Sequence, residues 1–125
     1  MEIKQLILDS IKWTVNTLGW TLISDDWGNA NDKCTCAMGC VLLKDNPQDV
    51  VIIEEERENA SKVAELLGVS ELWVDSFING FDGNRTFESS KLPEAWAMGA
   101  ELAKETKPIT HFNFLEAKME EDYDE

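Results

Sequence analysis

The segment 59–80 has the pattern of two short helices joined by a tight turn, and it constrains the fold more than any other part of the chain. Asn59 and Ser70 are residue types that cap helix N-termini, and each precedes a stretch with apolar residues at helical spacing. Gly68 separates the two stretches, and glycine readily adopts the left-handed conformation that ends a helix. Gly80 is placed to end the second stretch. The residues expected to face inward are Val63, Ala64, Leu67, Val74, Phe77 and Ile78.

From Val63 to Gly80 the residues follow the spacing V-A-x-L-x-G-V-S-x-x-x-V-x-x-x-x-N-G. This segment resembles the helix-turn-helix of the lactose-repressor class, and the phage-repressor class is similar. Ala64, Gly68 and Val74 fall on the positions where those families pack their two helices together. The resemblance implies that the solvent face at the start of the second helix would read base edges in DNA. Carried over to this chain, that face consists of Glu71, Leu72, Asp75 and Ser76.

The charge of this segment argues against DNA binding. Glu71 and Asp75 can neither neutralise a phosphate nor donate a charged hydrogen bond to guanine. The whole chain has 25 acidic residues against 11 Lys and Arg, a formal net charge of -14. Non-specific DNA affinity comes chiefly from counterion release by Lys and Arg, and that contribution is absent here. We therefore interpret the segment as a structural helix pair and expect no direct DNA binding, with a helix-turn-helix transcriptional regulator as the alternative.

Apolar spacing and turn residues predict further elements outside this pair. An amphipathic helix is expected over 3–18 and stops near Gly19. Pro93 stands where helices often begin, and it predicts a helix that ends before Pro108. The β-branched run over 50–53 fits a strand or a helix, and we favour a helix because no partner strand is evident. The other expected elements are an Asx- and Gly-rich loop over 20–33, a buried helix over 36–43, a loop over 81–91 and a strand or turn over 109–115.

These elements predict a mainly α-helical fold, a compact bundle of about five helices that contains the helix-turn-helix-like pair. A length of 125 residues, 43% hydrophobic residues and five Trp support a packed core. We expect a single helical domain over 1–115 and an acidic flexible tail over 116–125, where six acids accompany one Lys. No run of 18 apolar residues and no apolar signal region is present, so we expect no membrane contact and a cytoplasmic location.

Three cysteines, Cys34, Cys36 and Cys40, lie within seven positions. An odd number of clustered cysteines does not suggest a secreted disulfide framework. Thiolates at this density can bind zinc, yet a closed structural site needs four ligands, and the fourth would be Asp32 or the single histidine, His111. Cysteines one turn apart on an apolar helix behave as small hydrophobic residues. We interpret all three as core residues and expect no cofactor, with a metal or redox protein, or a Cys34–His111 catalytic pair, as the remaining hypotheses.

Two loops rich in Asp and Asn are candidates for calcium binding, and the first has oxygen-bearing side chains at alternating positions, as at the start of a calcium loop. One runs from Asp82 to Glu88, and the other lies between Asp25 and Asp32. The first lacks the glycine at the sixth place and the bidentate acid at the twelfth. Asx and Gly residues are also typical of turns, and we interpret both segments as turns. Because no phosphate loop, nucleophile elbow or His-Glu metal helix is present, we expect a protein that is not an enzyme.

The surplus of acids is the remaining indication of function. A strong negative field steers basic partners towards a protein. Small acidic phage proteins that block restriction or CRISPR enzymes resemble this composition. We therefore predict a non-enzymatic interaction protein, such as a phage or mobile-element inhibitor or decoy, that binds the basic surface of a nucleic-acid-handling protein. Aromatic side chains carry much of the energy of such contacts, so the expected contact residues are Trp27, Asp25, Asp26, Glu71 and Asp75.

Overall fold

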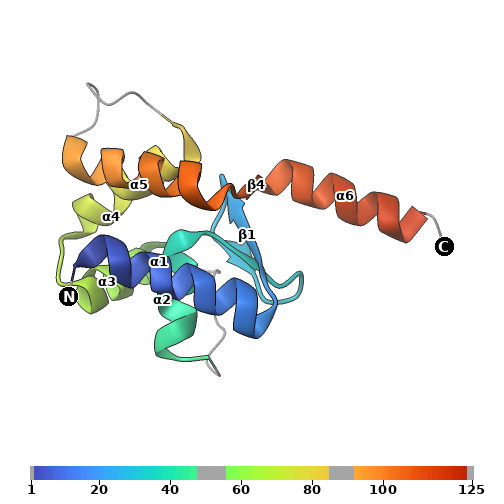
Figure 1. Cartoon of the computed structure of the whole chain (residues 1–125), viewed down its shortest axis with the longest axis horizontal. Helices are drawn as coiled ribbons and strands as arrows, with labels where there is room; N and C mark the ends of the chain where they lie inside the picture. The colour runs from blue at the N-terminus through green and yellow to red at the C-terminus, as the bar shows by residue number, and fades with distance from the viewer. Residues whose placement is uncertain (1, 48–55, 85–91, 124–125) are drawn as a thin grey trace.

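A computed structural model describes residues 2–47, 56–84 and 92–123, and most of these residues are helical. The prediction of a mainly α-helical fold is confirmed (Figure 1). The helices are α1 (Ile3–Trp13), followed by a π-helical turn η1 (Thr14–Leu18), α2 (Ala37–Asp45), α3 (Glu56–Leu67), α4 (Glu71–Asp82), α5 (Pro93–Thr106) and α6 (His111–Tyr123). The strands are β1 (Thr21–Ser24), β2 (Gly28–Asn29), β3 (Cys34–Thr35) and β4 (Ile109–Thr110). The run 50–53 lies outside the described residues.

The predicted pair of helices is present as α3 and α4. Gly68 has a φ of 71° and ends α3, and the Ser70 hydroxyl accepts a hydrogen bond of 3.1 Å from the Trp73 backbone N–H. The prediction for Asn59 was wrong, because α3 begins at Glu56 and Asn59 lies buried inside it. Residues 56–58 are Glu, Arg and Glu, which have good helix propensity and extend the helix towards the N-terminus.

Helices α4 and α5 pack closely because each contributes a glycine to the contact. A Cβ atom at Gly80 would overlap the Trp96 carbonyl oxygen, and one at Gly99 would overlap the Phe77 carbonyl oxygen. The sequence predicted that Gly80 ends the second helix, and this prediction was wrong. The helix runs on to Asp82 and is closed by Gly83, with a φ of 73°. Of the expected loop over 81–91, Phe81 and Asp82 are thus helical, and 85–91 lie outside the described residues.

The segment 20–33 was predicted to be a loop, and this prediction was wrong. It contains β1 and β2, which belong to a small sheet with the order β2-β3-β1-β4. Strand β1 is parallel to both neighbours, with Thr21 opposite Cys34 and Ser24 opposite Thr110. Strand β4 occupies the first two residues of the segment for which a strand or turn was expected.

Helix α2 lies at the centre of the core, in contact with α1, α3 and α4. Every residue from Ala37 to Leu43 is buried, as predicted for 36–43. Gly39 permits close packing, because a Cβ atom there would overlap the Thr35 hydroxyl. The amphipathic helix expected over 3–18 is present as α1 and η1, and Gly19 ends it with a φ of 75°.

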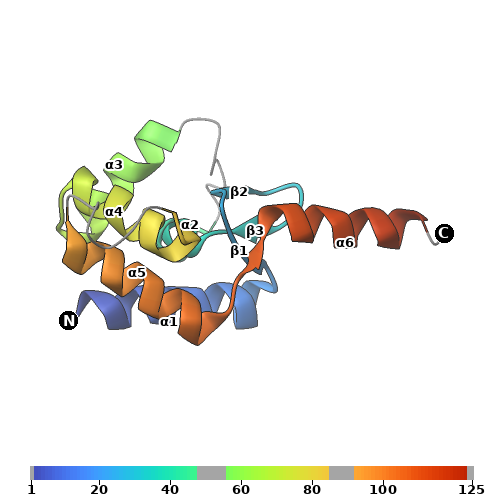
Figure 2. The same cartoon turned by 90° about the horizontal axis from the view of Figure 1, so that it is seen from above.

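The chain after β4 continues as α6, so the acidic segment 116–125 does not begin as a separate tail. Its residues up to Tyr123 are helical, since Glu, Ala, Lys and Met have good helix propensity. Figures 1 and 2 show α6 extending away from the other helices in two perpendicular views. The boundary expected at residue 115 therefore falls inside a helix.

We predict that Gly99→Ala lowers the free energy of unfolding by about 1–3 kcal/mol, because the added methyl group forces α4 and α5 apart. Helix propensity alone would make this substitution stabilising by about 1 kcal/mol. Ala97→Gly, on the exposed face of α5, measures the propensity contribution without the packing contribution. Urea unfolding of the three proteins tests the prediction, and a Gly99→Ala variant as stable as the parent chain would contradict it.

Candidate functional site

Trp27 was predicted to be a surface contact, and this prediction was wrong. Its side chain is 7% exposed and belongs to the main hydrophobic core. The Trp27 carbonyl oxygen accepts a hydrogen bond of 3.0 Å from the Cys36 N–H, so the loop folds back against the start of α2. Trp20 is also buried. The two tryptophans that border the acidic loop therefore stabilise its base and are not available to a partner.

All three cysteines are buried, as predicted for core residues. Burial raises the pKa of the Cys36 thiol to about 12 and also raises the pKa values of Cys34 and Cys40. The Cys34 sulfur lies 4.0 Å from the Asn29 side-chain nitrogen, and no hydrogen bond joins it to His111 in the described part of the chain. Within the same residues, no group of three or more His, Cys, Asp or Glu side chains is arranged to hold a metal ion.

We predict that the folded protein reacts slowly with a thiol-specific reagent such as DTNB at pH 8, because the thiolate form is disfavoured at all three positions. Unfolding in guanidinium should expose three equivalents of thiol at once. The absorbance of the thiolate released from DTNB measures the rate of reaction in the folded and in the unfolded protein. Rapid reaction of one thiol in the folded protein would contradict the prediction and support a reactive cysteine.

The two acidic loops considered for calcium meet at the end of β1. The Asp25 backbone N–H donates a hydrogen bond of 2.8 Å to the Asp82 Oδ1 atom. The next residue, Asp26, accepts a hydrogen bond of 3.2 Å from the Gly28 N–H. Its Oδ2 atom also lies 3.8 Å from Nδ1 of His111, at the start of α6. These contacts tie the ends of α4 and β1 to the base of α6. Only the bond between Asp26 and Gly28 is the local contact of an Asx turn. The segment from Asp25 to Asp32 also contains β2, and residues 85–88 of the other loop lie outside the described residues, so the interpretation of that loop as a turn stays a prediction.

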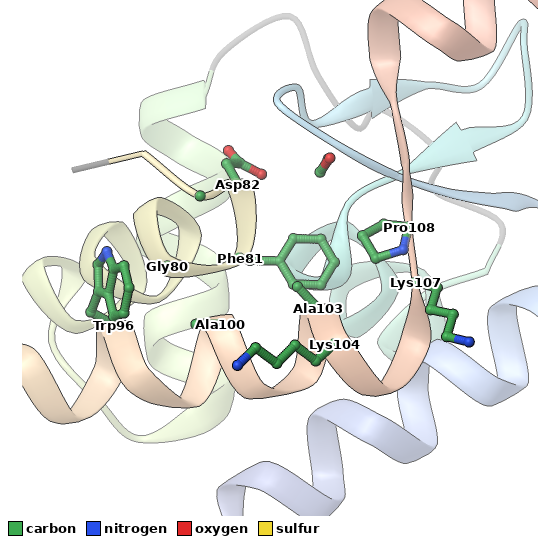
Figure 3. A pocket seen from close by; sticks show the side chains of 11 residues that line it. Gly80, Phe81, Asp82, Trp96, Ala100, Ala103, Lys104, Lys107 and Pro108 are labelled. Atoms are coloured by element: carbon green, nitrogen blue, oxygen red, sulfur yellow. The ribbon is translucent and has the colours of Figure 1, made fainter. Parts of the chain in front are cut away.

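A cavity of about 620 Å³ lies beside Asp82, between α4, α5 and the segment that leads to β4 (Figure 3). The figure shows the Asp82 carboxyl at one side, the Phe81 and Pro108 rings across the middle, and the Lys104 and Lys107 side chains at the other side. Burial is the main cause that raises the pKa of Asp82 to about 6, the negative charges of Asp25 and Asp26 add to it, and the hydrogen bond from the Asp25 N–H opposes it. Because one Asp82 oxygen accepts a hydrogen bond from the Asp25 N–H, we infer that this carboxyl has a structural role and connects the end of α4 to the end of β1.

We predict that Asp82→Asn stabilises the protein at pH 7.5, by about 1 kcal/mol once solvent screening is allowed for. The pKa of Asp82 is about 6 in the folded chain and near 3.8 when unfolded, so ionisation of this group costs stability above pH 6. The folded state binds the extra proton between these two values, and the cost disappears as the pH falls from 6 towards 4. The amide keeps an oxygen for the Asp25 N–H.

Thermal unfolding between pH 4 and pH 8 measures this effect, and Asp45→Asn, at an exposed carboxyl on α2, is the matched control. The gain from Asp82→Asn should shrink as the pH falls from 7.5 to 4.5, whereas the control should show no such trend. A constant difference at every pH would show that charge at Asp82 does not limit stability.

Helix α6 carries the most exposed large apolar side chains in the described residues. Phe112 is 69% exposed and Met119 is 71% exposed, and Leu115 between them is 38% exposed. The side of α6 that faces the protein carries Phe114 and Lys118 instead. Sequence reasoning missed this surface because the acids after residue 115 indicated a tail. The spacing of three and four between 112, 115 and 119 was the signal available.

The acidic residues predicted at the start of α4, Glu71 and Asp75, are exposed. Leu72 beside them is 43% exposed, but Ser76 is 4% exposed and faces the core. The four residues carried over from the repressor families therefore do not form one solvent face. Burial and the nearby Glu71 raise the pKa of Asp75.

No protein-family model, curated protein or solved structure matches this chain. Within the described ranges, no helix is both long and apolar enough to cross a bilayer.

Proposed function

We propose that this protein is a non-enzymatic binding protein whose acidic surface occupies a basic site on a nucleic-acid-handling protein. The observation that supports this proposal is the large number of surface carboxylates that form no ion pair within the described residues. In the described part of the chain, Lys side chains form ion pairs with Glu101, Glu105 and Asp32, and Asp26 lies 3.8 Å from the His111 ring nitrogen. The exposed acids without such a pair include Glu2, Asp25, Asp45, Glu65, Glu71, Asp75, Glu94, Glu116 and Glu120.

Uncompensated carboxylates create a negative potential that attracts a positively charged partner over several ångströms. A protein that binds nucleic acid presents Lys and Arg side chains to phosphates, and a surface of carboxylates meets the same side chains. Charges of this kind chiefly increase the association rate and select the partner. The net charge of -14 therefore favours a decoy that competes with nucleic acid over a protein that binds nucleic acid. This function places the protein in the cytoplasm, where nucleic-acid enzymes act.

The alternative is a transcriptional regulator that uses α3 and α4 as a helix-turn-helix. The geometry of the helix pair is compatible with that motif, since Gly68 and Ser70 shape the turn between them. The exposed residues at the start of α4 are Glu71, Leu72 and Asp75, and none of them can bind a phosphate. We favour the decoy because this charge pattern repels duplex DNA.

We predict that the tagged chain retains one basic nucleic-acid-binding protein from a lysate of its host cells at low salt and releases it at high salt. The purified partner should then lose its DNA as the chain is titrated in, measured by fluorescence anisotropy of labelled duplex. A variant with Glu65→Gln, Glu71→Gln and Asp75→Asn removes three exposed charges, so it should bind the partner several-fold more slowly.

The opposite result is also informative. If DNA fragments co-purify with the chain and no protein is enriched, the regulator is correct and the decoy is not. If neither is retained, the acidic surface has no role in binding and the proposed function fails.

A further inference from the structure

We infer that α6 is the docking element of this protein, and that Phe112, Leu115 and Met119 bind an apolar groove whose rim carries Lys and Arg. This inference rests on the proposed function, because it takes the partner to be basic. To the proposed function it adds two points: α6 makes the contact, and the partner's site is apolar as well as basic.

The three side chains form one continuous stripe. Residues three and seven positions apart lie on the same face of a helix, so Leu115 and Met119 follow Phe112 along α6. Phe112 and Met119 are 69% and 71% exposed, whereas the other exposed large apolar side chains described outside α6, Val15, Leu66 and Leu72, are at most 43% exposed. Phe and Met side chains gain more free energy from burial than most residues do, and a partner has to supply that burial.

Contacts at the base and middle of α6 fix the direction in which the stripe faces. Strand β4 pairs with β1 directly before the helix, and His111 lies against Asp26. About two turns further on, the Lys118 ammonium donates a hydrogen bond of 2.6 Å to Asp32 and lies 5.9 Å from the centre of the Phe114 ring. The helix is therefore held before any partner binds, which lowers the entropy cost of docking. Beyond these contacts it extends away from the other helices (Figures 1 and 2).

The charges around the stripe select the occupant. Glu116 and Glu120 are exposed and lie beside the stripe, on the side away from Lys118. Lys118 is the one Lys or Arg in the α6 sequence, and it contacts Asp32. A second copy of the chain would bring another net charge of -14 to this face, and an anionic membrane would also repel it. In a groove with a basic rim, the Lys and Arg side chains would pair with the carboxylates of α6 and the apolar floor would bury the stripe. Amphipathic helices bind apolar grooves in this way in other complexes.

The first test uses a defined probe, a fluorescein-labelled helical peptide with leucine along one face and lysine on both sides of it. Anisotropy is measured at ~0.3 M salt, where the Debye length is about 6 Å and long-range attraction is screened. The double variant Phe112→Ser with Met119→Ser should raise the dissociation constant at least tenfold, by about 1.4 kcal/mol. Leu66→Ser with Leu72→Ser removes two exposed leucines elsewhere and should leave the constant within about twofold.

All four substituted side chains are exposed, so both variants should keep the parent circular dichroism spectrum and melting temperature. Equal binding of the peptide by the parent chain and the α6 variant would overturn the inference, and so would loss of binding in the leucine control alone. In either case the protein retained from lysate by the parent chain would still support the proposed function. Failure to retain any basic protein would instead count against the proposed function.

Two further measurements exclude other occupants. Sedimentation equilibrium at high protein concentration should show a monomer. A dimer that the α6 variant abolishes would assign the stripe to a second copy and overturn the inference. Co-sedimentation with phosphatidylcholine vesicles should leave the protein in the supernatant, and pelleting that depends on Phe112 and Met119 would assign the stripe to a lipid surface.

Discussion

Strand β1 connects parts of the chain that would otherwise be independent. Its four residues pair with Cys34–Thr35 on one side and with Ile109–Thr110 on the other, so one strand joins the start of the buried α2 to the start of α6. The residue after it, Asp25, has a φ of 69° and turns its N–H towards Asp82 at the end of α4. The position of α6, the acidic turn at its base and the cavity beside Asp82 all depend on this short parallel pairing. The two strand pairings are backbone interactions, whereas the link to α4 depends on the Asp82 carboxylate.

The local features of the fold could be predicted from the sequence because their causes lie within a few residues of one another. Gly68 and Ser70 define the turn between α3 and α4, and Pro93 marks the start of α5. The burial of α2 followed from its uninterrupted apolar run. Asn59 shows the limit of this reasoning, since a residue suited to capping sits inside a helix when its predecessors also favour helix.

The features that were missed depend on partners far away in the sequence. Strand β1 could not be assigned, because the residues that satisfy its hydrogen bonds lie at 34–35 and 109–110. Trp27 was placed on the surface because its neighbours are acidic, whereas its own burial depends on how the loop returns to α2. Composition also concealed the stripe on α6. Six acids in ten residues indicate solvent, but on the helix the exposed acids Glu116 and Glu120 lie beside the stripe that carries Phe112 and Met119 and not within it.

The burial of the three natural thiols has a practical consequence for labelling. Because Cys34, Cys36 and Cys40 lie in the core, a cysteine introduced on the surface would be the readily accessible thiol of the folded chain. A fluorophore could then be attached at a single chosen position without first removing the natural cysteines, whose replacement by smaller residues would leave cavities in the core. A dye attached near the far end of α6 would change its emission when a partner approaches. The core of the protein would keep its natural residues.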